Sequence, residues 1–90
     1  MRANQQGGQP LRRPLRRTAL TGTAVAVIAD ILAVDRSRIS TTAPFADLGL
    51  SSAQLARLSA HLEDAFGVEV PVTALYDHPD IEQLVDSLMR

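Results

Sequence analysis

Residues 47–66 read DLGLSSAQLARLSAHLEDAF and predict the best-defined helix of this 90-residue chain. From residue 55 onward, small and apolar side chains recur at the i, i+3, i+4, i+7 and i+11 positions of one helical face, namely Leu55, Leu58, Ser59, Leu62 and Phe66. Gly67 follows directly, and a glycine in a left-handed conformation is a common helix end. We therefore expect an amphipathic helix that ends at about Phe66 and buries this face.

Two adjacent serines stand at the head of this helix, and their expected roles differ. Ser51 at the N-cap would place Gln54 at the third helical position, which completes an S-x-x-Q capping box. Ser52 then falls on the first helical residue, where the cap does not need its hydroxyl and the hydroxyl faces water. Unpaired backbone N–H groups and the positive end of the helix dipole lie there, so a phosphate attached to Ser52 would be favoured. Gly49 allows a tight turn, which lets another protein approach.

Upstream of the serines, the sequence predicts a first helix and a long connection. The helix is expected over residues 18–33, and its apolar face consists of Leu20, Ala24, Val27, Ile28, Ile31 and Leu32. The connection is rich in turn-forming residues, and a connection of this length in so small a domain must be anchored. Its candidate anchors are Ile39, Phe45, Leu48 and Leu50.

Downstream, the sequence predicts a short helical segment and a last helix. Pro71 and Pro79 bracket a span too short for more than about two helical turns. Asp80 is a good N-cap with Gln83 at the third position, and the apolar stripe that follows is Ile81, Leu84, Val85 and Leu88. The run VEVPV alternates, but it has no partner strand and Pro71 interrupts it. The expected fold is all-α: a small four-helix bundle with three main helices, a short third helix and a long loop between the first two.

The composition of the chain excludes several kinds of functional site. The chain has no cysteine, which excludes a disulfide framework and a cysteine-based metal site, and its two histidines lack ligand-like spacing. No apolar run is long enough to predict a membrane span. Known catalytic motifs do not occur, and His61 lies nine residues from Ser52 on the same helix, out of hydrogen-bond reach. We therefore expect no catalytic residue, no metal and no enzyme activity of the chain's own.

Charge divides the chain near residue 17. Five of the nine basic residues precede residue 18, and the first acidic residue is Asp30. We interpret residues 1–17 as a disordered arginine-rich tail and residues 18–90 as the folded domain. An arm for nucleic acid or anionic lipid, or a docking element for a partner protein, remain alternatives for this tail.

The segment FADLGLSSAQLARLSAHLEDAFGVEVPVTALYDHPDIEQLVDSL resembles the phosphopantetheine-attachment region of the acyl carrier protein family, in particular carriers of modular polyketide synthases. In that family an apolar-Gly-apolar turn precedes a two-residue step, commonly Asp-Ser, at the head of the second helix. Here residues 48–50 form the turn, Ser51 stands in the place of the acid, and Ser52 stands in the attachment place. The run LYDHPD at residues 75–80 corresponds to the polyketide-type signature LFDYPT.

The resemblance implies a cofactor and a function. A phosphopantetheinyl transferase would attach 4′-phosphopantetheine from coenzyme A to Ser52, and the thiol of that arm would hold an acyl group as a thioester. The domain would then present this group to an acyl- or aminoacyl-loading enzyme, an acyltransferase or a ketosynthase. The expected docking residues are Leu50, Ser51, Ala53, Gln54, Arg57, His61 and Ala74. We expect a cytoplasmic monomer that binds neither nucleic acid nor membrane.

Two alternatives stay open. The domain could be a peptidyl or aminoacyl carrier of a nonribosomal peptide pathway, although such carriers usually show Gly-Gly-His-Ser around the serine, whereas this chain has Leu-Ser-Ser. A different class of function is an unmodified helical adaptor, with the basic tail as a nucleic-acid-binding arm.

Overall fold

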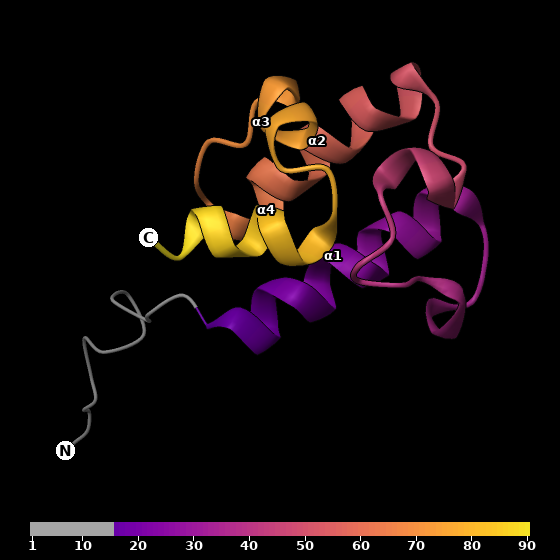
Figure 1. Cartoon of the computed structure of the whole chain (residues 1–90), viewed down its shortest axis with the longest axis horizontal. Helices are drawn as coiled ribbons and strands as arrows, with labels where there is room; N and C mark the ends of the chain where they lie inside the picture. The colour runs from indigo at the N-terminus through magenta and orange to yellow at the C-terminus, as the bar shows by residue number, and fades with distance from the viewer. Residues whose placement is uncertain (1–15) are drawn as a thin grey trace, which may run out of the picture.

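The computed structural model describes residues 16–90, which contain four α-helices and no strand (Figure 1). The helices are α1 (Arg17–Leu32), α2 (Ser52–Phe66), α3 (Val72–Asp77) and α4 (Ile81–Leu88), and the α1–α2 connection contains two 3₁₀ turns, η2 (Arg36–Arg38) and η3 (Phe45–Leu48). The expected all-α bundle with a short third helix and a long loop is confirmed. The disordered tail is predicted for residues 1–17, of which residues 1–15 lie outside the described residues; Arg16 is the N-cap of α1 and Arg17 its first residue, so these two belong to the helix. Within residues 16–90, no helix has the length and apolar character needed to cross a membrane.

Helix α1 packs against both α2 and α4 (Figure 1). It begins at Arg17, one residue before the expected start, and the guanidinium of Arg17 pairs with the Asp86 carboxylate of α4 at 2.5 Å. This hydrogen bond lowers the pKa of Asp86, and the charges of Arg17 and Arg90 act in the same direction. Because both side chains are about half exposed, this ion pair links the start of α1 to α4 and adds only modestly to the packing of the two helices.

The buried face of α1 differs in detail from the expected one. Leu20, Ala24 and Ile28 are buried as expected, but Ala29 is buried too, while Val27, Ile31 and Leu32 are only partly buried. Almost every side chain from residue 24 to residue 32 is apolar, so helical periodicity does not single out one face. The crossing of α1 with α2 and α4 makes that choice.

Buried side chains anchor the long connection at several points. Ile39, Phe45 and Leu50 are buried in the core, and Leu48 is partly buried against it, as expected. Hydrogen bonds tie the same connection to the region around the start of α4: the N–H of Phe45 donates to the Pro79 carbonyl at 2.7 Å, and the N–H of Glu82 donates to the Thr41 carbonyl at 3.1 Å. The turn that leads into α2 is therefore held from two sides.

The alternating run around Val70 is extended but joins no sheet. The hydroxyl of Ser59 donates to the Val70 carbonyl at 2.5 Å, and the N–H of Val70 donates to Glu63 Oε2 at 2.9 Å. Val70 is completely buried, so its backbone groups need partners that replace water. Two side chains of α2 supply them, and in this way α2 fixes the connection to α3.

Asp80 caps α4, although not through a full capping box. Its Oδ1 accepts from the Gln83 N–H and its Oδ2 accepts from the Gln83 side-chain amide, both at 2.8 Å. An aspartate offers two acceptor oxygens, so the side chain of Gln83 bonds to the carboxylate instead of reaching the backbone of the N-cap. The signature at residues 75–80 therefore spans the end of α3 and the cap of α4.

Candidate functional site

Ser52 presents a free hydroxyl at the first residue of α2. It is exposed, and its side chain forms no hydrogen bond within residues 16–90. Ser51 instead performs the whole capping role. Its Oγ accepts from the Gln54 N–H at 3.2 Å, and the Gln54 side chain accepts from the Ser51 N–H at 2.9 Å. The predicted capping box is thus confirmed, and it leaves Ser52 available for chemistry.

Two buried leucines hold this serine in place. Leu50 and Leu55, on either side of Ser52 in the sequence, are only 7% and 8% exposed. Gly49 makes the preceding turn with a φ of 94°, a left-handed value that residues other than glycine rarely adopt. The backbone around Ser52 is therefore rigidly attached to the core, while the hydroxyl itself points away from it.

The local backbone favours an anion on this hydroxyl. The N–H groups of Ser52 and Ala53 lie in the first turn of α2, where a helix provides no acceptor carbonyl. The first turn of α2 contains no acidic residue that would compensate for the positive end of the helix dipole. A phosphate ester of Ser52 would therefore meet unpaired N–H groups and no opposing carboxylate from that turn, so the residues present fit a phosphate-bearing group.

The seven expected docking residues fall into three groups by exposure. Ser51, Ala53, Arg57 and His61 are exposed, and Gln54 and Ala74 are partly buried. Leu50 belongs to the core, as its role as an anchor requires, so its side chain offers little surface to a partner. The docking role expected for Leu50, like that of the other six residues, stays a prediction.

An aromatic residue near the site was missed by the sequence reasoning. Tyr76 of α3 is 60% exposed, the most exposed large apolar side chain of residues 16–90. It borders a small apolar cavity of about 110 Å³ together with Pro44, Phe45, Ala46, Leu55, Leu75 and Pro79. Leu55 lies one turn after Ser52, so this cavity is close to the site. In the sequence, the apolar Leu75 directly precedes Tyr76 in a short helical segment, so the two side chains point in different directions, and this spacing could have indicated an outward-facing aromatic.

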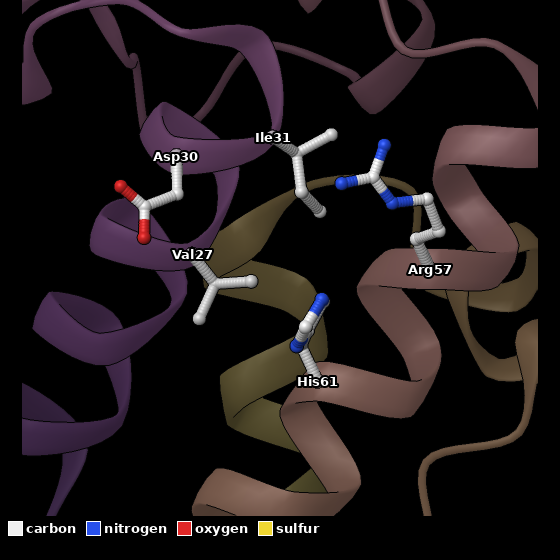
Figure 2. A pocket seen from close by; sticks show the side chains of 5 residues that line it. All are labelled: Val27, Asp30, Ile31, Arg57 and His61. Carbon is white, nitrogen blue, oxygen red and sulfur yellow. The ribbon is translucent and has the colours of Figure 1, made fainter.

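A larger cavity of about 320 Å³ lies on the other side of α2, between α2 and α1 (Figure 2). Val27, Asp30 and Ile31 of α1 line it, together with Arg57 and His61 of α2. We call this the α1–α2 groove. Figure 2 shows Val27 and Ile31 directed toward α2, the guanidinium of Arg57 directed toward Ile31, and the ring of His61 projecting into the space between the two helices.

A family model described as the phosphopantetheine attachment site matches residues 23–88, which is most of the chain. The chain belongs to this family. 4′-Phosphopantetheine is therefore the cofactor of this carrier domain, and the expected family and cofactor are confirmed.

Curated relatives of the carrier domain include large synthases and a small carrier protein. The chain is 32% identical over 75 residues to hispidin synthase of Neonothopanus nambi, and 33% identical over 64 residues to a phenolphthiocerol/phthiocerol polyketide synthase of Mycobacterium tuberculosis. These alignments cover 82% and 71% of the chain, but only 4% and 3% of the synthases. It is also 36% identical over 65 residues to the acyl carrier protein of Guillardia theta, covering 71% of the chain and 80% of that protein.

Solved structures of carrier proteins share the fold. A free-standing peptidyl carrier protein from Acinetobacter baumannii superposes with a TM-score of 0.74 at 26% identity, covering 80% of this chain and 90% of that one. The HMG-ACPI domain of the CurA module from Lyngbya majuscula gives a TM-score of 0.77 at 19% identity, covering 99% and 85%. The second comparison concerns the fold alone. The chain is thus similar in sequence to polyketide synthases and similar in fold to a peptidyl carrier protein as well as to an acyl carrier domain.

Proposed function

We propose that Ser52 carries the 4′-phosphopantetheine arm and that the domain presents an acyl or ketide intermediate on that arm to partner enzymes of a polyketide-type pathway. The observation that carries this proposal is the division between the two serines. Ser51 and Gln54 satisfy each other in the cap, whereas the hydroxyl of Ser52 is exposed without a hydrogen bond in residues 16–90. Only the second serine is free to react without dismantling the start of α2.

Each part of the site has a physical task in this proposal. The arm supplies a thiol that can hold the cargo as a thioester, and the cysteine-free chain has no thiol of its own. Leu50 and Leu55 fix the attachment point on the core, and the first-turn N–H groups favour the phosphate. The domain lowers no chemical barrier itself. Its contribution is to keep the cargo at high effective concentration near the enzymes that act on it.

The polyketide assignment is supported by the relatives and by the sequence around the serine. The matching proteins named as polyketide synthases include ones from Mycobacterium tuberculosis and Aspergillus flavus. The motif Leu50-Ser51-Ser52 is also unlike the usual motif of nonribosomal carriers. The expected partners are a phosphopantetheinyl transferase and then an acyltransferase or ketosynthase. The likeness to a peptidyl carrier protein favours an aminoacyl or peptidyl carrier as the second candidate.

Intact-mass analysis tests the attachment. The domain is incubated with coenzyme A and a broad-specificity phosphopantetheinyl transferase, alongside Ser52→Ala and the matched neighbour variant Ser51→Ala. We expect the native protein and Ser51→Ala to gain one phosphopantetheine each and Ser52→Ala to gain none. A gain that persists in Ser52→Ala would refute the assignment. No gain in the native protein would favour the unmodified adaptor.

A loading assay separates the two pathway types. The modified domain is offered to a malonyl-CoA-dependent acyltransferase in one reaction and to an adenylation enzyme with amino acids and ATP in another. Acylation by the first enzyme and not the second supports the polyketide assignment. Selective aminoacylation would support the peptidyl-carrier alternative instead.

A further inference from the structure

The α1–α2 groove combines an aliphatic wall with a basic one. Val27 and Ile31 of α1 are partly buried, and Arg57 and His61 of α2 are exposed and line the same cavity, with the guanidinium of Arg57 directed toward Ile31 (Figure 2). An occupant of this groove would contact methyl groups on one side and a guanidinium and an imidazole on the other.

The positive charge of Arg57 is not neutralised within the described residues. The ion pairs found in residues 16–90 join Asp86 to Arg17 and to Arg90, and none involves Arg57. Asp30 also lines the groove, but its carboxylate is directed away from Arg57 and from α2 (Figure 2). A guanidinium is a planar donor that fits a carboxylate through two parallel hydrogen bonds. The groove therefore complements an anionic group that has an apolar neighbour.

The surface of α2 between Ser52 and Arg57 carries small side chains as far as Ala60, and the exposed Asp64 follows one turn later. Ala53, Ala56 and Ala60 are all exposed. At about 100° per residue, these alanines fall between Ser52 and Arg57 around the axis of α2. Because alanine projects little beyond the backbone, a partner that crosses this face toward Ser52 can approach α2 closely. The same partner then reaches the α1–α2 groove at the other edge of the face.

We propose that a partner enzyme docks on this alanine face and places an acidic side chain against Arg57, with an adjacent aliphatic side chain against Val27 and Ile31. The proposal rests on the proposed function, because it is the arm on Ser52 that brings the enzyme to this face. A single exposed ion pair contributes little affinity, so the pair would act mainly by selecting the partner and its orientation.

Peptide titration of the isotope-labelled domain tests the chemistry of the groove. The protein is ¹⁵N-labelled in a Ser52→Ala background, which removes any dependence on modification. The two probes are synthetic peptides of equal length, one alternating leucine with glutamate and the other leucine with lysine. We expect the glutamate peptide to shift the backbone amides of residues 27–31 and 57–61 saturably, and the lysine peptide to leave them in place.

Charge variants of Arg57 should change this preference by a defined amount. Arg57→Gln should weaken binding of the glutamate peptide about threefold, which is the effect of losing one exposed ion pair. Arg57→Glu should weaken it about tenfold, because a repulsion of similar size is added, and should make the lysine peptide the better ligand. The matched control is Arg36→Glu in η2, which makes the same charge change outside the groove and should leave binding unaltered.

Several results would overturn the docking proposal. They are equal binding of the two peptides, absence of saturable shifts in both segments, and equal weakening by Arg36→Glu and Arg57→Glu. The outcome is independent of the modification assay. A domain that prefers the glutamate peptide but takes up no phosphopantetheine refutes the proposed function alone. A domain that is modified on Ser52 but shows no peptide preference refutes the docking proposal alone.

Discussion

Substitution of the two adjacent serines by alanine should separate stability from modification. Ser51→Ala removes the side-chain acceptor for the Gln54 N–H, while the backbone N–H of residue 51 can still donate to the Gln54 side chain. Ser52→Ala removes an exposed hydroxyl that has no hydrogen bond within residues 16–90. The two changes delete the same atom type one residue apart, so each is the control for the other.

The structure sets the size of each effect. Loss of a serine N-cap typically reduces the free energy of unfolding by about 1 kcal/mol. In a domain of this size, a loss of about 1 kcal/mol lowers the melting temperature by roughly 4–8 °C. Ser52→Ala should stay within about 0.5 kcal/mol of the native protein, because it removes no contact and alanine is the best helix former.

The measurement is urea and thermal unfolding of the unmodified proteins, followed by circular dichroism. Ser51→Asp serves as a third variant, because a carboxylate can also cap and is favoured at a helix N-terminus. It should equal or exceed the stability of the native protein. The assignment of roles fails if Ser52→Ala loses as much stability as Ser51→Ala, or if Ser51→Ala and Ser51→Asp are equally destabilised.

Three other perturbations test how the site is supported. Ser59→Ala leaves the buried carbonyl of Val70 without its donor, so it should lower the free energy of unfolding by about 1–3 kcal/mol, measured by urea titration against the exposed control Ser37→Ala. Gly49→Ala meets open space but keeps a left-handed φ, so it should cost about 1–2 kcal/mol through backbone strain, and a neutral result would mean that the turn relaxes. The hydrogen bond from Arg17 lowers the pKa of Asp86 below its ordinary value of 3.8 in the folded protein. The ion pair therefore stabilises the domain fully at pH values above 3.8, and this stabilisation is lost as the pH falls through the lower, folded-state pKa. Asp86→Asn should therefore lower the free energy of unfolding at pH 7. The free energy of the variant should also decrease less than that of the native protein as the pH is lowered, which urea midpoints measured across the acid range would reveal.

Much of the fold could be predicted because local signals agree with the tertiary structure. Helix α2 has a clear apolar period, a complete capping box and Gly67 in a left-handed conformation at its end. The two prolines around α3 limit it to six residues, and Asp80 starts α4. Each of these signals depends on neighbours within about one helical turn. Such signals can be read from one sequence without knowing the packing.

The features that could not be predicted depend on contacts between distant segments. The burial of Ala29 follows from how α1 crosses its neighbours, since its sequence is apolar on nearly all sides. The bonds from Ser59 and Glu63 to Val70 join a helix to an extended segment across a loop. The α1–α2 groove likewise requires α1 and α2 to be placed side by side. No local pattern encodes these distances.

The identity of residue 51 has a consequence for both proposals. A serine keeps the cap through its hydroxyl but carries no charge, and the first turn of α2 has no acid to replace it. The phosphate on Ser52 would then be the only negative group in the first turn of α2 that interacts with the positive end of the helix dipole. Along α2, the first charged side chain after Ser52 is that of Arg57. A basic partner would therefore find no acidic side chain between Ser52 and Arg57, whereas a partner with a carboxylate at the groove would find a complementary charge. The uncharged cap and an arginine that forms no ion pair within residues 16–90 both favour an acidic docking surface on the partner.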